Sequence, residues 1–388
     1  LSLRRQRQMC IRDSYITAVF ATLFLVGCGD GIDLRGVNVE TDLNKIPLPD
    51  NNVNLEQVEL KPSTEPMLHE GLHTEEDFQR IRDKKAAGEE PWVSAYQLLV
   101  ESQFSQKTAD TYPTEWIKRG VSGDENYMNA ARGATIAYQQ ALRWKIEQDD
   151  EYAAKAVENL NKWVQTCVGV TGNTNLSLAA GLYGYEFAIA GELLRDYEGW
   201  DRADFAAFQN WLLKVFYPAN DDFLKRHHDT NPLHYWANWC LCNIAAKMAI
   251  GIVTDRRDIY NEGIDHLQTG DTNGRLRRAI YHDYAPDYNF AQWQESGRDQ
   301  GHTLMCVGLM GIICQLAWSQ GDDFFAYDDN LFMRACEYAA CCNYTNETVP
   351  YTTYIWQKQS QWGYPIPEEQ TTLGGGKWIK RAIWALPY

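Results

Sequence analysis

Charged and hydrogen-bonding side chains gather in residues 295–302, directly before a long apolar run. The segment reads ESGRDQGH, and the residues that follow, TLMCVGLMGIICQLAW, are almost wholly apolar. In a helix, Glu295, Arg298 or Asp299, and His302 lie on one face. Charges beside a buried helix are costly unless they are paired or used. This face is therefore interpreted either as an ion-pair lattice between helices or as a catalytic stripe.

A second group of polar and aromatic residues has the sequence NPLHYWANW and covers residues 231–239. Pro232 suits the first position of a helix, because its φ is already helical and it lacks an N–H. This start predicts that His234 and Asn238 share one helical face. A stripe of Trp, His and Asn is suited to line a cleft. A core helix with a hydrogen-bonded Asn and His is the alternative that the residues leave open.

The longest irregular stretch, residues 270–295, supplies further aromatic candidates. Long loops in compact domains often carry function, and this one contains Tyr288 and Trp293. Tyr185, in the segment GLYGYEF, is another candidate for stacking on a ligand ring. Packing between helices explains Tyr185 equally well.

No metal or phosphate motif accompanies these residues. The histidines are scattered, HExxH is absent, and the pair Cys240 and Cys242 lacks further ligands at zinc spacing. We therefore expect no metal and no cofactor. The cysteines of the domain lie in apolar helical patterns and are expected to be buried and free. If some of them formed disulfides, the sequence would not show which cysteines pair.

Helical periodicity extends along the chain from Leu68 onward, and alternating strand patterns are nearly absent before residue 348. The residues His73-Thr74-Glu75-Glu76-Asp77 predict a capped helix start. About ten helices with short links predict an all-α domain of antiparallel helix hairpins, as a bundle, a solenoid or an α/α toroid. The expected helices cover 91–102, 127–147, 151–166, 176–195, 203–217, 233–250, 255–268, 297–319 and 330–342.

The N-terminal residues 1–27 have the pattern of a secretory signal. Arginines precede the apolar run 15–26, which is too short to span a bilayer. The run ends in LVGC, which resembles a lipobox, so Cys28 is expected to be acylated. We expect an exported protein in the periplasm or on the cell surface, bound to the membrane only through this lipid. The polar residues 28–66 predict a flexible tether. The domain is expected to span 67–388, and the native protein is expected to continue beyond residue 388. Whether the first residues of the chain belong to the native protein is left open.

The acidic composition excludes one class of partner. The formal charge is −16, from 36 Lys and Arg against 52 Asp and Glu, whereas a nucleic-acid binder needs a basic surface. Aromatic residues make up 13% of the chain, and their flat faces suit both core packing and sugar binding. We expect a monomer that does not bind nucleic acid.

These segments and their surroundings resemble the alginate lyase family of polysaccharide lyases. The resemblance extends from about Leu68 to the C-terminus, and its specificity comes from the joint order of several segments. It implies an incomplete α/α toroid that cleaves alginate or a related polyuronate by β-elimination without a metal. The supporting segments are GLHTEEDFQRIRDKKAAGEEPW, YQQALRWKIEQDDEYAAKAVENLNKWV, LAAGLYGYEFAIAGELLR, HYWANWCLCNIAAKMAIGI and QESGRDQGHT.

The resemblance also implies roles for individual residues. Arg298 matches the arginine that contacts the substrate carboxylate, and Asn238 and His234 lie where the family places its neutralising Asn and His. His302 is the first candidate for the group that removes the C5 proton and protonates O4, and Tyr288 is the second. Further substrate contacts are expected from Glu295, Gln300, Trp239, Tyr235, Tyr185 and Trp293.

The chain also departs from the family pattern. Better-known members carry adjacent Asn-Asn-His before Tyr-Trp, whereas here Asn231 is followed by Pro232 and Leu233, and Met305 stands where those members carry a catalytic Tyr. These departures keep open a glycan-binding lipoprotein without catalytic activity. A glycoside hydrolase that uses the carboxylates of Glu295, Asp299 and Glu186 is the other alternative. In the lyase interpretation, an acidic protein needs local positive charge around Arg298, for which the candidates are Lys225, Arg226 and residues 275–278.

Overall fold

The computed structural model describes residues 65–345, 347–359 and 365–376. The predicted signal segment 1–27, the lipidation site Cys28 and nearly all of the expected tether lie outside these residues and stay predictions.

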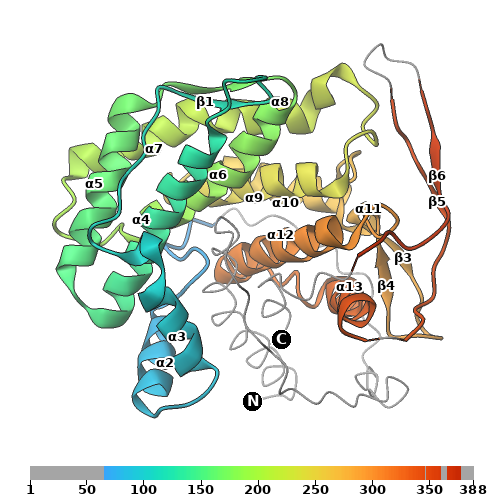
Figure 1. Cartoon of the computed structure of the whole chain (residues 1–388), viewed down its shortest axis with the longest axis horizontal. Coiled ribbons are helices and arrows are strands. Elements are labelled where there is room, and N and C mark those ends of the chain that lie inside the picture. The colour runs from blue at the N-terminus through green and yellow to red at the C-terminus, as the bar shows by residue number, and fades with distance from the viewer. Residues whose placement is uncertain (1–64, 346, 360–364, 377–388) are drawn as a thin grey trace.

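Helices make up most of the described chain, as the periodicity predicts (Figure 1). The predicted helices correspond to observed ones, and α8 and the short α11, which lies inside the stretch expected to be irregular, are additions that the sequence did not indicate. In chain order the elements are α2 (Glu75–Ala86), α3 (Trp92–Glu101), η3 (Gln103–Ser105), α4 (Tyr127–Glu147), α5 (Asp150–Thr166), α6 (Asn175–Leu193), α7 (Arg202–Val215), α8 (Tyr217–Arg226), η4 (His227–Asp229), α9 (Ala237–Val253), α10 (Arg257–Thr269), α11 (Leu276–Ala279), α12 (Gln300–Ser319) and α13 (Tyr327–Tyr344).

The helices α4, α6, α9 and α12 pack successively against one another and form an inner layer. Figure 1 shows α9 and α12 side by side through the middle of the molecule. In α9 every residue except Trp239 is buried, which is typical of a helix covered on all sides. The outer helices α5 and α10 pack against α4 and α9 and each keep one polar face. Apolar inner helices with amphipathic outer partners form an incomplete α/α toroid, which confirms the predicted all-α class.

Neighbouring inner helices run in the same direction. Gly181 in α6 lies against Cys242 in α9, and a side chain at Gly181 would collide with the Cys242 sulfur and the α9 backbone. Each of these residues lies about one and a half turns after its helix begins. Asn238, at the start of α9, contacts Glu295 in the turn before α12. The N-terminal ends of α6, α9 and α12 therefore meet at one end of the layer.

Short strands connect and cover the helices. Four of them lie among the described residues before 348, each three or four residues long, and the sequence shows almost no alternating pattern that would indicate them. Their pairing is β1 (Trp116–Arg119) parallel to β2 (Gly169–Gly172), β3 (Ile280–Asp283) antiparallel to β4 (Ala291–Trp293), and β5 (Tyr354–Trp356) antiparallel to β6 (Glu368–Gln370).

The start of α9 differs from the predicted one. The helix begins at Ala237, not at Pro232, because Asn231 directs a turn: its Oδ1 accepts from the Leu233 N–H at 2.8 Å and its backbone oxygen accepts from the His234 N–H at 2.8 Å. An Asn side chain that bonds to the backbone two residues later favours a turn over a helix. His234 therefore does not share a helical face with Asn238.

The start of α12 also differs from the predicted one. The helix begins at Gln300, and Asp299 is its N-cap in extended conformation, accepting from the backbone N–H of His302 at 2.8 Å. Glu295 and Arg298 thus lie on the turn between β4 and α12 and not on a helical face. An Asp side chain that accepts from a free backbone N–H of the first turn fixes the residue at which the helix begins.

The cysteines of the described chain are buried and free, as the apolar pattern predicts. They are Cys167, Cys240, Cys242, Cys306, Cys314, Cys336, Cys341 and Cys342.

One described helix, α12, is long and apolar enough to cross a membrane by length and composition. The most apolar part of this helix is 83% buried inside the protein. The apolar character of α12 is therefore that of a helix in the core of the protein.

Candidate active site

The fully buried carboxylate of Glu295 joins the start of α9 to the turn before α12. Its Oε1 accepts from the Asn238 backbone N–H at 2.8 Å and also from the Asn238 side-chain amide. Its Oε2 accepts from Arg298 Nη1 at 3.1 Å. Asn238 is only 1% exposed, so its amide donates within the protein. Both side chains are thus bonded within the protein, and Glu295 holds the guanidinium of Arg298 in place.

The guanidinium of Arg298 is fixed on two sides and open on another. Beyond its bond to Glu295, it lies over the ring of Trp236, with Cζ 5.2 Å from the ring centroid, and 3.9 Å from the carboxylate of Asp299. Its side chain remains 28% exposed. Since a guanidinium has five N–H donors in a planar fork, donors remain for an anion from outside.

Asp299 and His302 form a carboxylate–imidazole pair directly beside Arg298. The His302 Nδ1 lies 2.6 Å from Asp299 Oδ2, and the His302 side chain is 38% exposed. Burial favours the neutral form of Asp299, but the hydrogen bonds from the His302 backbone and imidazole outweigh it and lower the pKa of Asp299. An ionised Asp299 holds a proton on Nδ1, which leaves His302 Nε2 as a base.

His234 lies in the turn before α9 and is held by the tail of the described chain. Its Nδ1 accepts from the backbone N–H of Gln359 at 2.9 Å, so the imidazole proton lies on Nε2. Burial and the nearby charge of Lys358 lower the pKa of His234. This histidine is therefore neutral near pH 7 and offers an N–H donor.

The strand β5 supplies residues that sequence reasoning did not identify. The Trp356 indole donates to the His234 backbone oxygen at 2.7 Å, and its ring lies 4.3 Å from that of Trp236 and stacks on His234 at 6.1 Å. The indoles of Trp236 and Trp356 thus connect the Arg298 guanidinium with the imidazole of His234. Tyr354 and Trp356, which alternate at the end of YTTYIW, are typical of a strand, but the sequence does not indicate where that strand packs.

The aromatic candidates Tyr235 and Trp239 lie beside His234. Their rings are 4.8 Å apart, and Tyr235 is also 4.8 Å from the His234 ring. Tyr235 is buried, whereas Trp239 is half-buried. Tyr185 is half-buried on α6, where its hydroxyl donates to Glu186 at 3.5 Å. Of these rings, Trp239 and Tyr185 retain surface that a sugar is able to contact.

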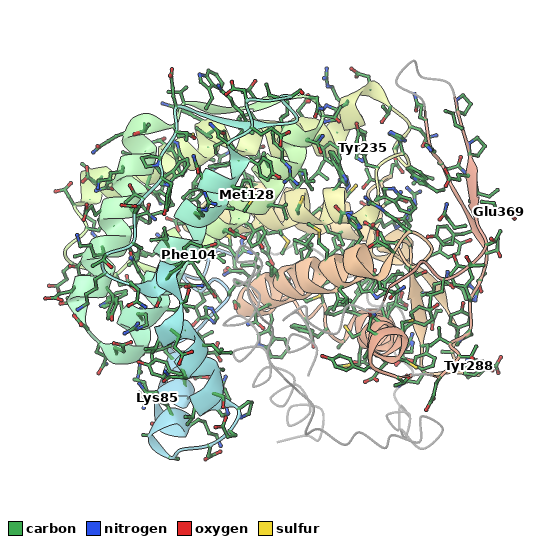
Figure 2. The ribbon with its side chains drawn as sticks, viewed as in Figure 1. Lys85, Phe104, Met128, Tyr235, Tyr288 and Glu369 are labelled. Atoms are coloured by element: carbon green, nitrogen blue, oxygen red, sulfur yellow. The ribbon has the colours of Figure 1, made fainter. Side chains whose placement is uncertain are left out.

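Three predicted residues have other surroundings. Trp293 is fully buried, and its indole donates to the Ala335 oxygen at 2.8 Å, so it packs the core and offers no face to a sugar. Gln300 is 2% exposed and accepts from Asn343 at 3.0 Å, which makes it a structural link. Tyr288 is 52% exposed beyond β3, with its ring 6.5 Å from that of Tyr284. Figure 2 shows Tyr288 at the edge of the molecule, well apart from Tyr235.

The expected local positive charge is largely compensated by neighbouring acids. The ion pairs are Lys225 with Asp221 at 2.9 Å, Arg226 with Asp222 at 2.8 Å, and Arg277 with Asp283 at 3.8 Å. These cations are therefore weak candidates for an anion site.

The assembled group consists of a partly exposed arginine, a neutral histidine donor and a histidine base held by a carboxylate. Within the described residues no group of three or more His, Cys, Asp or Glu side chains is placed to hold a metal ion. The N-terminal ends of α9 and α12 add positive partial charge at this end of the inner layer. The arrangement is suited to bind a carboxylate and to remove a proton close to it.

Comparisons with known proteins agree on one family. The alginate lyase family model matches residues 81–347. Alginate lyase A1-III from Sphingomonas species A1 has a similar structure, with a TM-score of 0.53 at 14% identity over 71% of this chain and 79% of that chain. A variant of that enzyme complexed with a tetrasaccharide gives 0.51 at 15% identity, over 71% of this chain and 80% of that one.

An alginate lyase from Bacteroides ovatus gives a TM-score of 0.50 at 16% identity, over 69% of this chain and 81% of that one. At these identities the structural likeness shows the fold alone. The comparison with curated proteins finds no match.

Proposed function

Because the chain belongs to the alginate lyase family and is a polysaccharide lyase, we propose that it cleaves alginate or a related polyuronate by β-elimination. The observation that carries this proposal is the adjacency of Arg298 to the Asp299–His302 pair on one turn. The related A1-III structure with a bound tetrasaccharide supports an anionic polysaccharide as the partner.

β-Elimination makes a definite demand on the protein. The C5 proton of a uronate is acidified by its carboxyl group, whose negative charge opposes the carbanion that forms when the proton leaves. Donors that bind this carboxylate stabilise the enolate-like transition state. A base removes the proton from C5, the C4–O4 bond breaks, and O4 receives a proton, which leaves a C4–C5 double bond on one product.

Arg298 is proposed to bind the carboxylate of the sugar that loses its proton. Its contact with the buried Glu295 fixes the guanidinium before substrate arrives, so little ordering is needed in the transition state. His234, neutral and with its proton on Nε2, is proposed to donate to the same carboxylate. Asn238 acts through Glu295 and is a positioning residue.

His302 is proposed as the base, with Asp299 as the group that orients it. The carboxylate holds Nδ1 at 2.6 Å, and Nε2 remains available for the C5 proton. The same imidazolium is then able to protonate O4 if the two positions lie on one side of the sugar. Tyr288 is the second candidate, and its exposed position beyond β3 supports it less.

The carboxylates of the hydrolase alternative fit that chemistry less well. A glycosidase needs two accessible carboxyl groups on either side of the scissile bond. Burial raises the pKa of Glu186 to about 8, which suits an acid, but Glu295 is fully buried and bonded to Asn238 and Arg298. Asp299 is occupied by His302. No second carboxylate of this set is thus free to act as a base.

Substitutions at Arg298 and His302 test the proposal. Arg298→Ala is expected to lower kcat on the true substrate by about a hundredfold, because its contact strengthens as enolate charge develops. His302→Gln is expected to lower kcat comparably. Arg226→Ala, which removes an exposed arginine paired with Asp222, is the matched control and should leave kcat unchanged. Full activity in both the Arg298 and His302 variants would place the reaction elsewhere.

We further propose that the native protein is an exported lipoprotein acylated at Cys28 and that it acts as a monomer. The apolar run 15–26 followed by LVGC supports this. Mass spectrometry of the protein from membrane fractions should find a lipid on Cys28, and Cys28→Ser should release the protein from the membrane. Light scattering at increasing concentration should give a constant monomer mass.

A further inference from the structure

Arg119, the last residue of β1, carries a charge that no described carboxylate neutralises. Its side chain has no ion pair or hydrogen bond within the described chain, and its Nη1 is enclosed without an acceptor. The guanidinium lies 4.6 Å from the ring centroid of Tyr127, and the residue as a whole is half-buried. Enclosing part of a guanidinium without an anion is costly, so this arrangement points to a ligand.

Other arginines with enclosed side chains each have a carboxylate partner within the chain. Arg143 pairs with Glu147, Arg195 with Glu192 at 2.8 Å, and Arg334 with Asp283 at 2.7 Å. The chain has 52 acidic residues against 36 basic ones, so acids are abundant. The lack of a carboxylate beside Arg119 is therefore a local feature of this position and does not follow from composition.

The place of Arg119 in the fold is the end of the inner layer where the helices begin. Its ring partner Tyr127 is the first residue of α4, and its strand partner Gly172 in β2 lies three residues before α6 begins. It therefore lies beside the beginnings of α4 and α6, and α6 packs on α9 through Gly181 and Cys242. Helix N-termini add positive partial charge, which favours an anion at this place.

Arg119 and Arg298 are separate sites at this same end. Cys242 lies one turn after Asn238 in α9, and Asn238 contacts Glu295, the partner of Arg298. No described contact joins the two guanidinium groups. A polyuronate carries one carboxylate on every sugar, so a chain held at Arg298 presents further carboxylates on both sides.

We propose that Arg119 binds the carboxylate of a second uronate residue, away from the sugar that reacts at Arg298. The inference rests on the proposed function for the identity of the ligand. Arg119 provides a planar fork for a carboxylate, and the face of Tyr127 keeps the guanidinium in place. Because this contact is made to a sugar that does not react, it is equally strong in the ground state and the transition state, and it contributes to binding.

The test compares substrates of different length. Arg119→Ala is expected to raise KM about tenfold on the polymer and on long oligouronates, with kcat within about twofold of wild type. On the shortest oligouronate that the enzyme cleaves, the KM of this variant should approach that of wild type. Arg119→Lys should recover part of the affinity, because it keeps the charge without the fork. Arg226→Ala is the control for loss of one positive charge, and thermal melting verifies that each variant is folded.

Direct binding separates this inference from the proposed function. Isothermal titration with saturated oligoguluronate, oligomannuronate and oligoglucuronate, and with neutral cello-oligosaccharides as the uncharged comparison, needs no catalysis. Binding of an oligouronate that Arg119→Ala weakens about tenfold supports the site, even if wild type cleaves none of them. Unchanged KM and unchanged binding in Arg119→Ala overturn it while leaving the lyase proposal intact. Absence of both cleavage and binding in wild type overturns both.

Discussion

The buried carboxylate of Glu295 gives the sharpest prediction. The change Glu295→Gln keeps the size of the side chain but replaces one carboxylate oxygen by an amide that only donates. If the remaining oxygen faces Asn238, the new NH₂ faces Arg298 Nη1, which is also a donor. If the amide turns over, it faces the N–H groups of Asn238. One partner therefore loses its acceptor in either orientation.

The magnitude follows from the burial of the pair. Breaking a fully buried ion pair costs about 3–5 kcal/mol, and Arg298 is 28% exposed while Glu295 is 0% exposed. Water therefore partly replaces the lost partner of Arg298, and we expect a loss of about 2 kcal/mol in the free energy of unfolding. For a domain of this size, that lowers Tm by about 4 °C. Because Arg298 loses its anchor, kcat should also fall by about tenfold or more.

Calorimetry and steady-state kinetics on the same preparations measure both effects. The matched control is Glu192→Gln, which breaks another buried pair, with Arg195, toward the other end of α6. That variant should lose stability while keeping wild-type kcat. A Glu295→Gln protein with wild-type kcat would refute the claim that Glu295 positions Arg298, and an unchanged Tm would refute the buried ion pair itself.

Three further predictions concern the histidines and the β5 strand. Asp299→Asn keeps an N-cap for α12 but removes the acceptor that orients His302, so kcat should fall about tenfold or more with little change in KM; an unchanged kcat would exclude His302 as an oriented base. Trp356→Ala removes the ring between Trp236 and His234 and should raise KM; kinetics identical to wild type would separate β5 from the site. Burial lowers the pKa of His73 to about 4, although the nearby charge of Asp77 raises it. The pKa in the folded protein therefore lies below the unfolded value, so His73 contributes stability above pH 6.5 that is lost as the pH falls toward 4. Between about pH 7.5 and about pH 5.5 the loss from this residue is about 1.4 kcal/mol; urea titrations of His73→Gln should show a correspondingly smaller pH dependence, and an equal dependence would contradict the buried neutral imidazole.

Much of the fold follows from local pattern. The capped helix start that the sequence predicts is present at α2, where Thr74 and Asp77 form a capping box, and the apolar stretches produce the inner helices because only burial on all sides accommodates them. The all-α class could be predicted for this reason. The exact starts of α9 and α12 could not, because they depend on single side chains, Asn231 and Asp299, that bond to the backbone in place of the helix.

The site could be predicted only in part. The polar residues Arg298 and His302 could be singled out because polar residues beside an apolar helix have few other uses, and both lie beside Asp299. His234 is connected to Arg298 only through the indoles of Trp236 and Trp356. The bond between Asn238 and Glu295 could not be predicted, since it joins α9 to the turn before α12. Long-range contacts of this kind have no local signature, and the same applies to the packing of β5 over His234.

Incubation of the purified protein with polymannuronate, polyguluronate and glucuronan tests the central claim most directly. The ultraviolet absorbance of the conjugated double bond and the number of reducing ends are recorded together. A β-eliminating lyase raises both in equal molar amounts on at least one of these polymers, which is the result that we predict. New reducing ends without ultraviolet absorbance would identify a hydrolase, and no change in either quantity on any polyuronate would contradict the account.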